Sequence, residues 1–84
     1  MQALELYHLV HHTPFQPFRI YLRDGRTFDV RYPHLAIVGA TFFTLGIPSP
    51  DDPDPYYYDT VEILDLPYID RAEPITAPDS AGRN

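Results

Sequence analysis

Apolar and polar residues alternate strictly along two short runs in the first half of the chain. Every second residue is apolar across residues 18–22, and again across residues 28–30. Alternation with a period of two residues is typical of β-strands that bury one face. Between the two runs stands Asp24-Gly25, a dipeptide that favours a tight hairpin turn. Residues 18–31 are therefore predicted to form a β-hairpin.

The apolar face decides the register of this hairpin. A two-residue turn would place Ile20 on the same face as Asp29 and split the apolar face, because a shift of one residue turns every side chain over. A three-residue loop at Arg23–Gly25 instead places Ile20 opposite Phe28 on one buried face. The glycine of this loop then takes a left-handed conformation as a bulge, which it adopts without strain from a Cβ atom. We predict this register, in which Arg19 lies opposite Asp29.

The rest of the chain contains one helical segment and further short strands. Residues 3–12 lack Gly and Pro and place Leu6, Leu9 and Val10 at helical spacing, so one helix face is able to dock on a sheet. Residues 48–55 contain four prolines and three aspartates, which predicts a loop. The other predicted segments are strands at residues 35–38 and 41–47, which are nearly continuous in apolar residues; a strand at 56–64 with Tyr57, Val61 and Ile63 on its inner face; a break or single 3₁₀ turn at 65–67; and a strand at 68–73.

This order of elements favours a small β-barrel. We predict a mainly β protein with one N-terminal helix, folded as a small five-stranded SH3-like or Sm-like barrel, a closure that protects strand edges. Residues 1–75 are expected to form this single domain. Residues 76–84 have little to bury and are expected to be a disordered tail. Because a chain of 84 residues buries only a marginal core, we also expect it to form oligomers.

Two stretches of the chain resemble the sequences of a known family. Residues 14–26, Pro-Phe-Gln-Pro-Phe-Arg-Ile-Tyr-Leu-Arg-Asp-Gly-Arg, and residues 30–33, Val-Arg-Tyr-Pro, resemble the opening of a family of short uncharacterised bacterial proteins. This resemblance spans about the first half of the chain and implies no activity. More loosely, the preceding helix, the Leu-x-Asp-Gly-Arg motif at residues 22–26 and the break at 65–67 are similar to the Sm-like fold.

The Sm-like resemblance implies a barrel that assembles into a ring through its last two strands. The bacterial Sm-like RNA chaperone contacts RNA through a motif of the Tyr-Lys-His type near its end. Residues 61–70 of this chain lack that motif and carry acidic residues instead.

Charge is distributed unevenly and argues against a polyanionic partner. The net charge is −6, no lysine occurs, and residues 49–84 hold nine acidic residues against two arginines. Nucleic-acid binding requires a basic face, so nucleic acid is an unfavourable partner. The chain has no cysteine, which excludes disulfides and thiolate metal sites and fits a reducing compartment. No apolar run is long enough to span a membrane and no signal peptide is evident, so we expect a soluble, cytoplasmic protein.

Polar clusters in the sequence have simpler explanations than catalysis or metal binding. The three histidines of residues 8–12 have a spacing that is able to ligate zinc, but only Glu5 stands near to complete the set, and we interpret them as a solvated helix face. The aspartates of residues 51–54 lack the spacing, glycine and glutamate of a calcium-binding loop. Ser49 and Ser80 lie in no phosphate loop or nucleophile elbow. We expect no catalytic residue, no metal and no cofactor.

Tyrosines are the strongest candidates for a binding surface. In a strand, Tyr56 and Tyr58 share one face, where their rings either pack in a covered sheet face or stay exposed as interface residues. With Tyr68, they are our candidates for an interface. The resulting hypothesis is a non-enzymatic protein-interaction module that forms a homo-oligomer or binds an unknown protein partner.

A second hypothesis treats the hairpin arginines as a binding face. The alternative function is an Sm-like RNA-binding protein that uses Arg23, Arg26 and Arg31. The simpler explanation is that these are solvated strand arginines, and the pairing of Arg19 with Asp29 already removes one cation from such a face.

Overall fold

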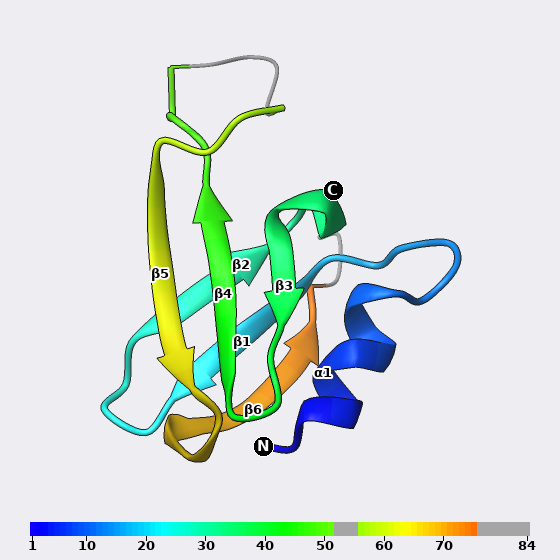
Figure 1. Ribbon diagram of the computed structural model, residues 1–84, viewed down its shortest axis with the longest axis vertical. Helices are drawn as coiled ribbons and strands as arrows, with labels where there is room; N and C mark the ends of the chain where they lie inside the picture. Colours follow the sequence, from blue (N-terminus) through cyan, green and yellow to red (C-terminus); the bar gives the residue numbers. More distant parts are fainter. Residues whose placement is uncertain (52–55, 76–84) are drawn as a thin grey trace, which may run out of the picture.

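Two three-stranded antiparallel sheets and one short helix make up the fold (Figure 1). The computed structural model describes residues 1–51 and 56–75. Sheet A has the order β2-β1-β6 and sheet B the order β3-β4-β5. The elements are α1 (Ala3–Val10), β1 (Phe18–Leu22), β2 (Thr27–Val30), the 3₁₀ turn η1 (Pro33–Leu35), β3 (Ala36–Val38), β4 (Phe42–Ile47), β5 (Thr60–Asp65), the 3₁₀ turn η2 (Leu66–Tyr68) and β6 (Ile69–Pro74).

The mainly β fold with an N-terminal helix is confirmed, but the closed five-stranded barrel is wrong. Each predicted strand range contains a strand, which makes six among the described residues, and they belong to two separate sheets. The chain crosses from one sheet to the other through η1 and η2, which contain Pro33 and Pro67. Because proline has no N–H to donate, regular ladder pairing is interrupted at both crossings. The sheets therefore pack against each other without closing into one.

The predicted hairpin register is confirmed. Arg19 lies opposite Asp29, and the apolar residues of β1 and β2 meet on one face. Gly25 has a φ of +93° and donates its N–H to the carbonyl of Leu22 at 3.0 Å. Leu22 in turn donates to the carbonyl of Arg26 at 2.9 Å. These two bonds close the three-residue loop that the apolar pattern requires.

The core lies between the two sheets and the helix. Leu6 and Val10 are buried and Leu9 packs against the core, so the predicted apolar helix face is the one that docks. Alternate residues of each sheet point into the same core, as expected of half-buried antiparallel strands. The buried cluster consists of Leu6, Val10, Phe18, Ile20, Leu22, Val30, Phe43, Leu45, Leu64, Leu66 and Ile69.

The inner face predicted for β5 is the wrong one. Leu64 lies directly opposite Phe43 of β4, and both are buried. Because directly opposite residues in a sheet share a face, Val61 and Ile63 must point outward. Both are exposed, as is Tyr57, which lies outside the strand. The pairing of β5 with β4 therefore places Val61 and Ile63 outside the core, although β-branched residues are common in cores.

Some predicted boundaries also differ from those of the structure. The helix ends at Val10 rather than at residue 12, and β5 begins at Thr60 rather than at residue 56. The last strand extends to Pro74. The predicted tail at 76–84 and residues 52–55 of the predicted loop lie outside the described residues.

Replacing Gly25 tests the hairpin loop. A Cβ atom at this position would meet no other atom within 4 Å, so Gly25→Val perturbs the backbone conformation alone. We expect Gly25→Val to lower the free energy of unfolding by about 1–2 kcal/mol in urea denaturation. Gly25→Asn is the control, and its loss should be smaller because asparagine tolerates the left-handed region. A valine variant as stable as the unchanged protein contradicts this loop.

Candidate interaction surface

The outer face of sheet A is covered by paired charges. Arg19 of β1 binds Asp29 of β2 through two hydrogen bonds, of 2.6 and 3.2 Å. On β6, the guanidinium of Arg71 lies 2.8 Å from Glu73 and 4.0 Å from the ring centre of Tyr21. The face is therefore charged but internally neutralised.

These contacts shift the pKa values of the carboxyl groups. Hydrogen bonding to Arg19 lowers the pKa of Asp29 below its ordinary value. The backbone N–H of Arg26 lowers the pKa of Asp24, and the Arg71 side chain lowers that of Glu73. Each shift favours the charged carboxylate in the folded protein.

The outer face of sheet B is mostly apolar. Ile37 of β3 and Ile63 of β5 lie directly opposite Thr44 of β4 from its two sides, and each isoleucine is 65% exposed. An antiparallel sheet with one solvated face normally carries polar residues there. Here the outward positions of sheet B, which we call the outer face, are Ile37, Phe42, Thr44, Gly46, Val61, Ile63 and, as the one charged residue at the end of β5, Asp65.

The three candidate tyrosines do not form one cluster. Tyr56 and Tyr58 are exposed and precede β5 instead of lying in it. Tyr58 packs over Gly46, since a Cβ atom added to that glycine would come within 3.0 Å of the Tyr58 Cβ. Tyr58 therefore borders the outer face of sheet B. Tyr68 follows β5 in η2, and its hydroxyl donates to Asp24 of the hairpin loop at 3.5 Å.

The three candidate arginines are occupied by local partners. Arg26 pairs with Asp24 at 2.8 Å and Arg31 with Asp29 at 3.3 Å. Arg23 donates to the backbone carbonyl of Pro67 at 2.7 Å. Two of the three thus have their charge balanced by acids of the same hairpin.

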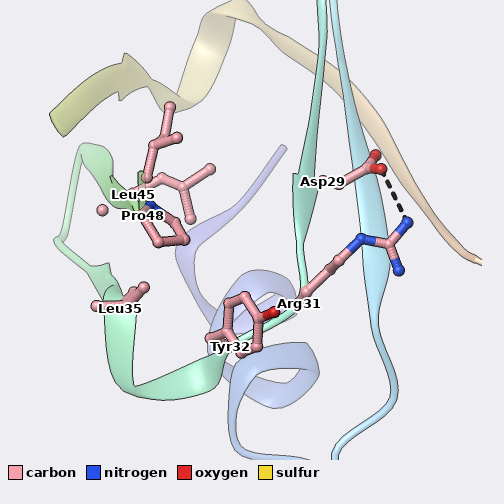
Figure 2. A pocket seen from close by; sticks show the side chains of 8 residues that line it. Asp29, Arg31, Tyr32, Leu35, Leu45 and Pro48 are labelled. Atoms are coloured by element: carbon pink, nitrogen blue, oxygen red, sulfur yellow. Dashed lines mark hydrogen bonds and ion pairs between the residues drawn. The ribbon is translucent and has the colours of Figure 1, made fainter. Parts of the chain in front are cut away.

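A small cavity opens between the two sheets, between β2 and β4 (Figure 2). Its volume is about 200 Å³, below the size of about 300–1,000 Å³ common for small-molecule sites. Figure 2 shows Arg31 turning its guanidinium toward Asp29, away from Leu35 and Pro48. The cavity therefore has apolar walls and a charged rim, without a cation directed into it.

The described residues contain no group of three or more His, Cys, Asp or Glu that could hold a metal ion. The His11 ring packs against that of Tyr7 at a tilt of 40°, with ring centres 4.2 Å apart, and the Nδ1 of His12 donates to the Pro14 carbonyl at 2.9 Å. Asp52 and Asp54, which the sequence analysis compares with a calcium-binding loop, lie outside the described residues. In the described part of the chain, no helix has the length and apolar character needed to cross a bilayer.

Sequence reasoning missed the outer face of sheet B. The pattern predicts Val61 and Ile63 on the inner face of their strand, and residues 35–38 and 41–47 as nearly continuous apolar strands of a small barrel. One signal was present in the sequence: Leu64 and Leu66 continue the other phase of the alternation, the phase that the core uses.

Acid denaturation tests the charged face of sheet A. A carboxyl whose pKa is lowered by folding stabilises the protein above its unfolded pKa, and this stability is lost as the pH falls through the folded value. The midpoint temperature of thermal unfolding should therefore decrease as the pH is lowered below about 4. Because Asp29→Asn removes one such group, we expect it to lower the midpoint at pH 7 by about 2–5 °C and to flatten the pH dependence.

Asp59→Asn is the matched control, because it removes the same charge from an exposed aspartate whose side chain has no ion pair among the described residues. Thermal unfolding followed by circular dichroism measures both variants. Equal pH profiles for the two variants contradict a stabilising role of the Arg19–Asp29 contact.

No family model, no curated protein and no solved structure matches this chain. The resemblances to a family of short bacterial proteins and to the Sm-like fold stay predictions.

Proposed function

We propose that this protein is a non-enzymatic protein-interaction module that associates with itself through sheet B. The observation that carries the proposal is the exposed apolar face that includes Ile37 and Ile63. Contiguous exposed apolar surface on a small domain marks interaction sites. The two sheets differ sharply in this respect, since the outer face of sheet A is charged.

The residue types of the outer face suit an interface. Ile37, Val61 and Ile63 are β-branched and restricted about χ1, so burying them costs little additional side-chain entropy. Tyr58 borders the face and supplies an aromatic ring with a hydroxyl able to form a hydrogen bond. Of the three tyrosines that the sequence suggests for an interface, we place Tyr58 at the contact. Tyr56 and Tyr68 would take part only if the contact extends beyond the outer face.

RNA binding is the second hypothesis, and no contact among residues 1–51 and 56–75 favours it. Arg26 and Arg31 are paired with aspartates, and the net charge of −6 opposes approach to a polyanion. Charge also separates the hypotheses in experiment. Added salt weakens RNA binding by reducing counterion release, whereas it strengthens association between two acidic copies by screening their repulsion.

Light scattering of the full chain tests self-association. We expect the mean mass to rise between about 10 and 500 µM protein, and to rise further with added NaCl. The double variant Ile37→Lys/Ile63→Lys should remain monomeric, because at least one of the added charges would have to be desolvated in a contact made by the outer face or by the edge of β5. Gln16→Lys/Thr27→Lys adds the same charge at exposed positions away from the outer face and should behave as the unchanged protein.

Two results contradict the proposal. One is a monomer at every concentration and salt level, and the other is association that the Ile37→Lys/Ile63→Lys variant leaves unchanged. Fluorescence anisotropy with a generic single-stranded RNA at low salt completes the test. Micromolar binding that weakens with salt would support the RNA hypothesis instead.

A further inference from the structure

We propose that two copies of this chain pair through the free edges of their β5 strands, antiparallel, with Ile63 of one copy opposite Ile63 of the other. The two copies of sheet B would thereby join into one continuous antiparallel sheet. The inference rests on the proposed self-association and adds its geometry: which strand pairs, in which direction and in which register.

Comparison of the four edge strands singles out β5. Strand β2 has four residues and β3 has three, so both offer short edges. Strand β6 begins with a register irregularity against β1, carries three charged residues and ends at Pro74, all features that hinder edge pairing. Strand β5 has six residues without proline, pairs with β4 alone, and lies at the outer side of sheet B (Figure 1, yellow).

The hydrogen-bond pattern shows which groups β5 leaves free. At the end of the β4–β5 ladder, Leu66 donates its N–H to Thr41, the residue directly opposite, at 3.0 Å. Because bonded and non-bonded pairs alternate along an antiparallel ladder, even-numbered residues of β5 bond to β4. The odd-numbered residues Val61, Ile63 and Asp65 therefore direct their N–H and C=O groups toward the free edge.

This alternation restricts how a second β5 is able to pair. Only odd-numbered residues offer backbone groups, so an odd residue must lie opposite an odd residue. Placing Val61 opposite Ile63 of the second copy would bring the two Glu62 side chains opposite each other at about 4.5 Å between Cα atoms, which like charge disfavours. Placing Val61 opposite itself would require Asp59, whose N–H already binds the Ile47 carbonyl at 2.7 Å. The register centred on Ile63 avoids both conflicts.

Side chains in this register are compatible. Ile63 meets its copy on the outer side of the joined sheet, and Val61 lies beside Asp65 of the second copy at the ends of the contact. Glu62 lies opposite Leu64 of the second copy, so no two acids face each other. The apolar outer faces of the two copies become continuous.

The contact is small, and its affinity should be correspondingly low. An edge of six residues buries less than the roughly 1,200 Å² at which stable interfaces begin. We therefore expect a dissociation constant on the order of 100 µM. The net charge of −6 on each copy lowers the affinity further at low salt.

Single-cysteine variants test the register, because the chain has no cysteine of its own. In the proposed dimer the two Ile63 Cα atoms lie about 5.5 Å apart, whereas the two Val61 Cα atoms lie about 13 Å apart along the strands. We treat Ile63→Cys, Val61→Cys and Ile37→Cys at 500 µM and high salt with a thiol cross-linker that has a two-carbon spacer. Ile63→Cys should yield at least about fivefold more cross-linked dimer on denaturing gels than either control.

A mixed experiment adds a second constraint. Equal amounts of Val61→Cys and Asp65→Cys should cross-link to each other more than either does to itself, because these positions lie opposite each other in the proposed register. In light scattering, Ile63→Lys should abolish the dimer while Ile37→Lys, equally exposed on the same face, leaves it intact.

The outcomes separate this inference from the proposed function. If the unchanged protein associates but Val61→Cys or Ile37→Cys cross-links best, the pairing is wrong and self-association stands. The same holds if Ile37→Lys and Ile63→Lys abolish association equally, which indicates face-to-face packing. If the unchanged protein stays monomeric at 500 µM and high salt, both proposals fail.

Discussion

The pairing of Phe43 with Leu64 across β4 and β5 decides which side of sheet B is buried. Directly opposite residues must share a face, so burying this pair points the alternate residues of β4 and β5 away from the core. Val61 and Ile63 are exposed as a consequence, although their residue types suit a core. The surface to which we assign function therefore follows from a packing requirement on the opposite side of the same strands.

The same constraint has a different outcome in sheet A. There the outward positions of β1, β2 and β6 carry arginines and carboxylates that neutralise one another, beginning with the Arg19–Asp29 contact of 2.6 Å. Surface ion pairs of this kind contribute little net stability, but they keep a sheet face solvated. An acidic chain with its described arginines so engaged has little free positive charge. Of the two sheets, only sheet B has exposed large apolar side chains among the described residues.

The sequence predicts local features well and long-range pairing poorly. The register of the β1–β2 hairpin depends on one short loop and on the alternation of its flanking residues, so it follows from the sequence. The inward face of β5 depends on its pairing with β4, which is more than ten residues away and separated from it by a proline-rich segment. The residues of β5 taken alone are compatible with either face of the strand pointing into the core. The prediction of a closed barrel failed because proline-containing turns at both crossings keep the sheets apart.

Symmetry explains why an exposed edge need not lead to open-ended assembly. Pairing of β5 with itself about a two-fold axis uses the same edge of both copies and leaves no further β5 edge free. Pairing of β5 with β3 of another copy would instead leave a free edge at each end, so it would repeat into a larger ring or an open fibre. Strand β3 has only three residues and lies beside α1, which limits its use as a partner. Glu62 adds a restraint within β5, because it disfavours the register that would match Val61 with Ile63. The acidic side chain that weakens the edge as a general docking site thereby also disfavours one of the alternative registers, and the engaged N–H of Asp59 disfavours another.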